Sequence, residues 1–165
     1  MARDIWVTSD THFGHENIIR YCNRPFDNVW DMNETLIHNW NTVVKDEDIV
    51  YHLGDVGMGG KSSDLSDILS RLKGRKRLII GNHDDGESPV LRLHFQKIRV
   101  WRMFTEFGLL LTHVPVHEGT LNEKKCPMNV HGHTHNHNIN DKRYKNVSVE
   151  QTNYIPVNID ELRQW

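Results

Sequence analysis

Five places in the sequence share one feature: a short, β-prone apolar run that ends in a polar loop holding Asp, Asn or His. The five loops contain Asp10-Thr11-His12, Gly54-Asp55, Gly81-Asn82-His83-Asp84, Thr112-His113 and Gly132-His133-Thr134-His135. In α/β folds the carboxyl ends of the strands meet at one edge of a sheet, and the loops there carry the functional site. We therefore expect these five loops to converge in space, although they are spread over most of the chain.

Between and after these runs, helical and strand-like segments alternate. Strands are expected at residues 5–9, 48–53, 77–80, 98–103, 107–112, 128–131 and 147–149, and helices at 16–23, 31–44, 63–73, 88–95 and 160–165. Asn33 or Asp31 is the candidate N-cap of the second helix, and the strands at 98–103 and 107–112 are predicted to pair as a hairpin. The alternation indicates an α/β fold with some antiparallel strands.

Composition predicts a single domain over residues 1–165, because no repeat, low-complexity tract or linker interrupts the chain. The 20 basic and 22 acidic residues give a formal charge of −2, so no overall field favours binding to nucleic acid or a membrane. The apolar runs are far shorter than the ~18 residues of a membrane span, and the N-terminus has no apolar signal region. Two cysteines cannot form a disulfide framework, so we expect a cytoplasmic protein.

The chain contains twelve histidines, and imidazole serves either proton transfer or metal binding. If the loop segments are extended, Asp10 and His12 share one side, as do His133 and His135. Together the loops offer several imidazoles, two carboxylates and an amide oxygen, which is too many ligands for one tetrahedral zinc ion. They suit two divalent cations that share a bridging carboxylate. Mixed nitrogen and oxygen ligands favour Mn²⁺, Fe, Zn²⁺, Co²⁺ or Ni²⁺ over Mg²⁺ or Ca²⁺, and no thiolate is needed because neither cysteine lies in these loops.

The order of the motifs, D-x-H, G-D, G-N-H-D, an isolated H and G-H-x-H, resembles that of the calcineurin-like metallophosphoesterases. All five motifs are present between Asp10 and His135, and the opening D-T-H-F-G-H looks like a small, single-domain bacterial and phage branch of that family. The resemblance implies a β-sandwich of two mixed sheets flanked by helices, in α-β-β-α layers. It implies a hydrolase of phosphodiester bonds, with phosphomonoesters as further substrates, that uses two divalent cations; Mn²⁺ is the expected metal.

The resemblance also implies a role for each motif residue. One metal would be held by Asp10, His12 and His135, and the other by Asn82, His113 and His133. Asp55 would bridge the two metals, and a hydroxide between them would be the nucleophile. His83 would act as the catalytic imidazole, a general acid or transition-state stabiliser, and Asp84 would orient it.

Four further residues have two interpretations each. His15 either contacts phosphate or caps the helix that follows it. Arg20 either clamps phosphate or is an ordinary surface side chain, and we keep both as candidate substrate-binding residues. His52 and His131 each precede a motif glycine by two positions, and for them hydrogen-bonded core roles are favoured over direct metal binding.

We expect the substrate to be a small phosphorylated molecule such as a nucleotide. The first alternative is a nuclease acting on single-stranded or damaged nucleic acid, which the near-neutral charge disfavours because such proteins usually carry a basic face. The second is a non-catalytic metal-binding scaffold on the same fold. Such a scaffold is expected to lose His83 or some of the ligands, whereas this chain has them all. The sequence makes no prediction of the oligomeric state.

Overall fold

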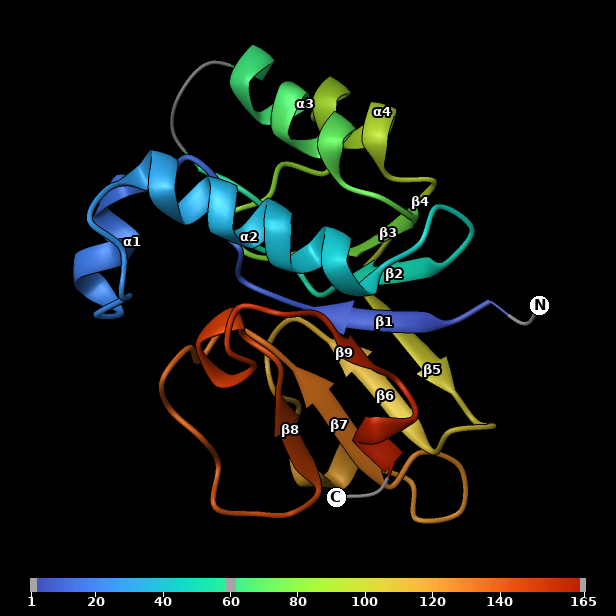
Figure 1. Ribbon diagram of the computed structural model, residues 1–165. Coiled ribbons are helices and arrows are strands. Elements are labelled where there is room, and N and C mark those ends of the chain that lie inside the picture. The colour runs from blue at the N-terminus through green and yellow to red at the C-terminus, as the bar shows by residue number, and fades with distance from the viewer. Residues whose placement is uncertain (1–2, 59–61, 164–165) are drawn as a thin grey trace.

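The computed structural model describes residues 3–58 and 62–163, and two stacked β-sheets form its centre (Figure 1). The first sheet has the order β4-β3-β2-β1-β9, formed by Lys97–Arg99, Arg75–Ile79, Ile49–His52, Ile5–Thr8 and Val157–Asn158. The second has the order β5-β6-β7-β8, formed by Trp101–Phe104, Leu109–Thr112, Met128–His131 and Tyr144–Asn146. In each sheet one end strand, β9 or β5, is antiparallel to its neighbour and the other pairs are parallel. The predicted pair of mixed sheets flanked by helices is confirmed.

The long helices lie over the outer face of the first sheet (Figure 1). The α-helices are α1 (Glu16–Tyr21), α2 (Val29–Val43), α3 (Ser62–Arg71) and α4 (Pro89–His94), and the 3-10 helices are η1 (Glu118–Thr120), η2 (Val149–Gln151) and η3 (Glu161–Arg163). Successive side chains of a strand point to opposite faces. Leu78 of β3 therefore packs against the helices, whereas Ile79 packs between the two sheets. Among the described helices, none combines the length and apolar character that crossing a bilayer requires.

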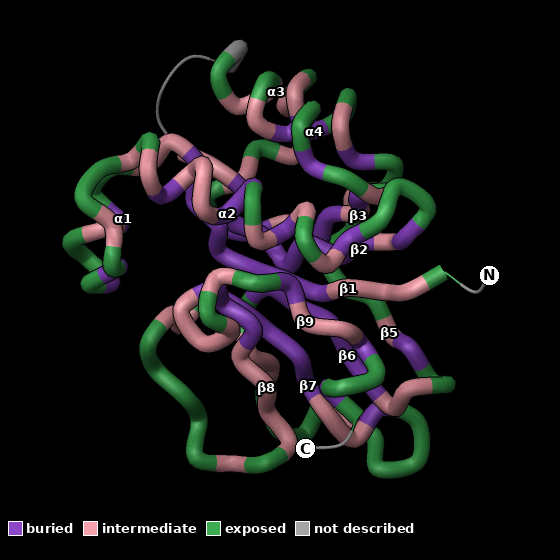
Figure 2. The backbone as a smooth tube through the Cα atoms, in the orientation of Figure 1, coloured by how far each residue is buried: buried purple, intermediate pink, exposed green. Residues whose placement is uncertain are grey.

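The second sheet packs against the first sheet with its inner face, and its outer face lacks the helices that cover the first sheet. Figure 2 shows buried backbone concentrated along β1, β6 and β7, where the two sheets meet. On its outer face, the second sheet has loops rather than an α-helix, as far as the described residues extend (Figure 1). The outer α-helical layer expected on this sheet from the α-β-β-α arrangement is therefore replaced by loops in the described structure.

The strand predicted at 98–103 is wrong as a single element, because the structure divides it between the two sheets. β4 is parallel to β3 in the first sheet, and β5 is antiparallel to β6 in the second. The chain crosses from one sheet to the other at Val100, which is 72% exposed. The crossing contains no Gly or Pro, and both Val100 and Trp101 are β-prone, so the residue types do not mark the change of sheet. The predicted hairpin of β5 and β6 is confirmed.

Other predicted boundaries also need correction. The last strand of the second sheet is β8. In the segment predicted as a strand at 147–149, Ser148 makes only an isolated bridge to Ser9, and Val149 begins the 3-10 helix η2. Val147 is buried between the two sheets and Val149 is buried on the helix side of the first sheet, which explains the strand-like composition of this segment. The second helix begins at Val29, because the side chain of Asn28 caps it by accepting from the backbone N–H of Asp31. The helix predicted at 160–165 is the 3-10 turn η3, and residues 164–165 lie outside the described residues.

Candidate metal centre

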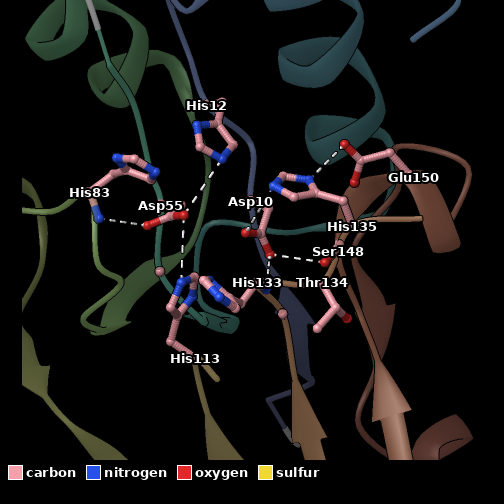
Figure 3. Close-up of polar contacts among 12 residues, drawn as sticks. Asp10, His12, Asp55, His83, His113, His133, Thr134, His135, Ser148 and Glu150 are labelled. Carbon is pink, nitrogen blue, oxygen red and sulfur yellow. Dashed lines mark hydrogen bonds and ion pairs between the residues drawn. The ribbon is translucent and has the colours of Figure 1, made fainter. Parts of the chain in front are cut away.

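The five polar loops converge at the carboxyl ends of β1, β2, β3, β6 and β7, as expected (Figure 3). Two groups of side chains form there. In the first, the ligand atoms of Asp10, His12 and His135 all lie within 4.8 Å of one another. In the second, the same holds for Asp55, His113 and His133.

Asn82 completes the second group. Its Oδ1 lies 2.8 Å from Nε2 of His113 and 2.9 Å from Nδ1 of His133. Nδ1 of His113 donates to the carbonyl oxygen of Leu53 at 2.7 Å, so Nε2 of a neutral ring presents a lone pair to the amide oxygen. Two acceptors at this distance repel each other, and a cation bound to both would stabilise the arrangement.

Asp55 lies between the two groups (Figure 3). Its Oδ2 is 3.6 Å from Nε2 of His12 in the first group and 3.5 Å from Nε2 of His113 in the second. Its Oδ1 accepts from the backbone N–H of His83 at 2.9 Å. One oxygen of a fixed carboxylate therefore faces both groups, which is the position that a bridging ligand requires.

Buried polar atoms without partners show that the first group fits a cation. Oδ1 of Asp10 and both ring nitrogens of His12 are buried and have no hydrogen-bond partner. Such atoms normally cost free energy, and they suggest an ion when they face one another. Oδ1 of Asp10 lies 3.8 Å from Nε2 of His135. Burial, with a smaller contribution from the Arg24 charge, lowers the pKa of His12 to about 2, so its ring is neutral and can bind a metal.

The backbone of the ligand loops is strained. A left-handed φ occurs at Asp10 (58°), His12 (51°), Asp55 (55°), His133 (67°) and His135 (46°). This conformation costs L-residues about 1–2 kcal/mol each and clusters at functional sites. The expected extended geometry is therefore wrong. His133 and His135 contribute to different groups, whereas Asp10 and His12 share one because of their turned backbone.

The close approach of two loops requires glycine at position 54. A Cβ there would lie 2.6 Å from the backbone of Gly81 and 2.7 Å from Nδ1 of His113, and φ is +99°. The loops after β2 and β3 can therefore lie against each other, which brings Asp55 beside Asn82.

Sequence reasoning missed a buried network behind His135. Nδ1 of His135 donates to Oε1 of Glu150 at 3.0 Å, and Glu150 is paired with Arg24 at 2.7 Å. Arg24 also donates to the carbonyl oxygens of Asp10 and Thr11. The network fixes the His135 ring with Nε2 toward Asp10, as carboxylates commonly do for metal-binding histidines.

The surroundings of His135 change its pKa strongly. Burial alone would lower it, but hydrogen bonds with Cys22 and Glu150 raise the pKa of His135 to about 10. Cys22 thus lies beside the site, with its sulfur within 4.8 Å of ligand atoms of His135 and Glu150, which the position of the cysteines in the sequence did not predict. The sequence signal that could have pointed to Glu150 is its position directly after the apolar, β-prone segment 147–149.

Two hydrogen bonds position Asp10 from the opposite sheet. Its Oδ2 accepts from the backbone N–H of His133 at 2.9 Å and from the hydroxyl of Ser148 at 3.0 Å. With this oxygen occupied, Oδ1 is the atom left to face His135. Ser148 is a second residue that the motifs did not predict.

Asp84 has a different role from the predicted one. Its carboxylate accepts from the backbone N–H groups of Asp55 and Val56, each at 2.9 Å, and of Gly81 at 2.8 Å. Among the described residues, no hydrogen bond joins this carboxylate to the ring of His83. The prediction that Asp84 orients the His83 ring is therefore wrong. Asp84 instead holds together the loops after β2 and β3. Burial raises the pKa of its carboxyl group above the usual value.

The remaining candidates lie around this centre. His83 is exposed, and its ring centroid is 5.7 Å from that of His12. The His15 ring is 5.4 Å from that of His12 and makes no capping hydrogen bond to α1, which leaves it beside the first group. Arg20 is exposed and donates to Asn17 of the same helix. Within the described part of the chain no contact connects Arg20 to either group.

His52 and His131 are buried and hydrogen-bonded, as predicted, and neither belongs to a ligand group. Thr11 donates its hydroxyl proton to the carbonyl oxygen of Val56. Nε2 of His52 therefore donates to Thr11 at 2.9 Å, and its Nδ1 accepts from the backbone N–H of Gly54. A neutral His52 thus supports the loop that presents Asp55.

We expect His52 to make the metal-free protein sensitive to acid. Burial lowers its pKa from 6.5 to about 3, so below pH 6.5 the unfolded chain binds a proton that the folded chain does not. Stability that is fully present above pH 6.5 is then lost as the pH falls toward 3, by about 1.4 kcal/mol per pH unit. In His52→Gln, the difference in unfolding free energy between pH 7 and pH 5 should shrink by about 2 kcal/mol. Urea unfolding measures this, with the exposed His38→Gln as control; an unchanged pH dependence in His52→Gln would contradict it.

We expect Glu150→Gln to weaken metal binding by roughly 10–100-fold. Glutamine keeps an oxygen for Arg24 but removes the charge that orients His135. Calorimetric titration with Mn²⁺ measures the effect, which should be largest for one of the two ions. Glu118→Gln is the matched control, since it removes an exposed carboxylate paired with Arg143. Equal affinities in Glu150→Gln and the wild type would show that the network has no part in metal binding.

Comparisons with known proteins identify the family of this chain. An uncharacterized protein of Methanocaldococcus jannaschii is 46% identical over 167 residues, which cover 96% of this chain and 88% of that protein. The Gene 66 protein of Mycobacterium phage L5 is 39% identical over 89 residues, covering 53% of this chain and 42% of that protein. The crystal structure of AQ665 from Aquifex aeolicus, a protein of unknown function, superposes with a TM-score of 0.78 at 28% identity and 98% coverage of both chains. Residues 4–155 match the calcineurin-like phosphoesterase superfamily domain, and the chain belongs to that superfamily.

Proposed function

We propose that the protein hydrolyses phosphodiesters, and phosphomonoesters in addition, with two divalent cations. The observation that carries the proposal is the pair of ligand groups that share Oδ2 of Asp55. The first cation would be held by Asp10, His12 and His135, and the second by Asn82, His113 and His133. When bound, such cations lower the pKa of water and offset negative charge on phosphoryl oxygens. The mixed nitrogen and oxygen ligands support Mn²⁺, with Fe, Zn²⁺, Ni²⁺ and Co²⁺ as alternatives.

In this proposal His83 acts on the ester oxygen. Its ring makes no hydrogen bond within the described residues, and it lies at the exposed mouth of the centre. A water molecule adds to phosphorus and releases one proton to solvent, the bond from phosphorus to the ester oxygen breaks, and the departing oxygen takes a proton. A protonated His83 ring can supply that proton. Its backbone N–H meanwhile holds Oδ1 of Asp55.

The substrate would approach from the exposed side of the second group. Asn82, His83 and His133 are exposed, whereas Asp10 and His12 are buried below them. A phosphoryl group can therefore reach the centre from solvent without movement of the sheets. Small phosphorylated molecules, nucleotides among them, are the proposed substrates. A cytoplasmic location is part of the proposal and is supported by two cysteines that are free and buried.

The test is a screen of 4-nitrophenyl phosphate, bis(4-nitrophenyl) phosphate, nucleotides and cyclic nucleotides against Mn²⁺, Fe²⁺, Zn²⁺, Ni²⁺ and Co²⁺. We expect turnover with at least one of these ions and none with Asp55→Asn. A single-stranded oligonucleotide is included, and cleavage that falls steeply with salt would favour the nuclease alternative. Absence of turnover across the whole screen would reject the proposal. Two bound ions without turnover would instead favour a metal-binding scaffold.

A further inference from the structure

A large apolar cavity of about 540 Å³ opens directly beside the second ligand group. Asn82 and His113, both proposed metal ligands, line it together with residues of the second sheet and of the loop after β6. The cavity and the second group therefore share two side chains. A ligand bound to the metal through one part can extend into the cavity with another.

The apolar lining comes from the outer face of the second sheet. Trp101 and Met103 of β5 line the cavity, as does Leu110 of β6, whereas their strand neighbours Phe104 and Leu109 pack between the sheets. Loops rather than an α-helix cover this face of the described structure (Figure 1). Large apolar side chains are left partly in solvent as a result.

Three of these side chains are notably open to solvent. Val100 is 72% exposed, Trp101 is 56% exposed and Val114 is 46% exposed, and all three line the same cavity. Single exposed apolar residues are common, but a concave cluster of them is typical of a binding site. Burying this surface against an apolar ligand would remove it from water and would favour binding.

The polar atoms of the cavity do not call for a polar ligand. The hydroxyl of Thr112 donates to the carbonyl oxygen of Val114 and accepts from the side chain of Asn129. No Asp, Glu, Lys or Arg lies among the described residues that line the cavity. A sugar or a charged group placed there would lose water and meet a mostly apolar lining, whereas a hydrocarbon ring or chain would lose little.

We propose that this cavity binds an apolar ester substituent of the substrate while the phosphoryl group lies at the metal centre. The inference rests on the proposed function, and it names a substrate class for the same site: phosphoesters that carry a hydrocarbon ring or chain. The continuity of the cavity with Asn82 and His113 favours this occupant over a second copy of the chain. Trp101 would be the main contact, because its ring is the largest exposed apolar group in the lining.

The test measures binding without turnover. Phenylphosphonate and methylphosphonate carry the same phosphoryl oxygens, and their P–C bond is not an ester, so both serve as probes of protein loaded with Mn²⁺. We expect phenylphosphonate to bind at least about tenfold more tightly in calorimetry, as expected when a hydrophobic pocket recognises an added apolar group. 2-Hydroxyethylphosphonate should bind no better than methylphosphonate, because its hydroxyl would lose water in a lining that is mostly apolar.

The variant Trp101→Ala should reduce the preference for phenyl to less than threefold and leave methylphosphonate binding unchanged. Trp30→Ala is the matched control, since Trp30 is 70% exposed on α2 and lies outside the cavity lining. It should keep the wild-type preference. Circular dichroism of both variants checks that they fold.

Three outcomes would overturn the inference. The first is equal binding of the two phosphonates by the wild type, and the second is an unchanged preference in Trp101→Ala. The third is a dimer that Trp101→Ala dissociates without any change in phosphonate affinity, which would make the cavity an interface between copies. Failure of the proposed function is distinguishable, because a protein without esterase activity can still show the phenyl preference.

Discussion

Asp55→Asn is expected to abolish the binding of both cations and to lower kcat/KM by more than about 10³-fold. Oδ2 of Asp55 faces His12 on one side and His113 on the other, so no other described side chain can serve both groups in the same way. Oδ1 already accepts from the backbone N–H of His83. An asparagine would keep its amide oxygen in that hydrogen bond and turn its NH₂ group toward the two ligand groups. The variant would thus put an NH₂ donor in the place of Oδ2, the negatively charged oxygen that would bind both cations.

The loss should be visible in metal content as well as in rate. Elemental analysis of protein equilibrated with Mn²⁺ should give two ions for the wild type and fewer than one for Asp55→Asn. A factor of 10³ in rate corresponds to about 4 kcal/mol of transition-state stabilisation, which is plausible for the loss of two metals. Asp85→Asn is the matched control, because Asp85 is exposed on the neighbouring loop and caps only the backbone of Glu87. Two tightly bound ions in Asp55→Asn would show that Asp55 does not bridge.

The positions of the proposed ligands could be predicted from the sequence because each one follows a β-prone run. Parallel strands bring their carboxyl ends to one edge by geometry, so a local pattern is enough to place Asp10 beside Asp55 in the first sheet and His113 beside His133 in the second. Their conformation could not be predicted in the same way. The left-handed backbone at Asp10 and His12 is imposed by tertiary contacts, such as the hydrogen bonds from their N–H groups to the loop after β2.

The contacts behind the ligands were beyond sequence reasoning. Glu150 and Arg24 are separated by 126 positions and meet only because the two sheets stack. Asp84 follows His83 directly, yet its carboxylate turns away to three backbone N–H groups, which are strong and otherwise unpaired donors. The change of sheet at Val100 was missed for the same reason, since a strand's partners do not depend on its own pattern. That crossing forms one wall of the apolar cavity.

His83→Ala is expected to lower kcat by roughly 10²–10⁴-fold while both cations stay bound, as for the loss of a general acid. The ring of His83 belongs to neither ligand group. Its hydrogen bond to Asp55 comes from the backbone and is therefore kept by alanine. The variant should remove the proton donor without disturbing the metal ligands, which separates it from Asp55→Asn.

The size of the effect should depend on the leaving group. The leaving group of a 4-nitrophenyl ester is 4-nitrophenolate, a stable anion that needs little protonation. The alkoxide that leaves an alkyl ester is a much stronger base and needs a full proton. The loss in His83→Ala should therefore be at least tenfold larger for an alkyl phosphoester than for its 4-nitrophenyl counterpart. His38→Ala, a change of an exposed histidine on α2, should leave both rates unchanged. If His83→Ala lowered the rate equally for the two esters, His83 would stabilise the phosphoryl group rather than protonate the leaving oxygen. If the variant lost bound metal, His83 would be a metal ligand.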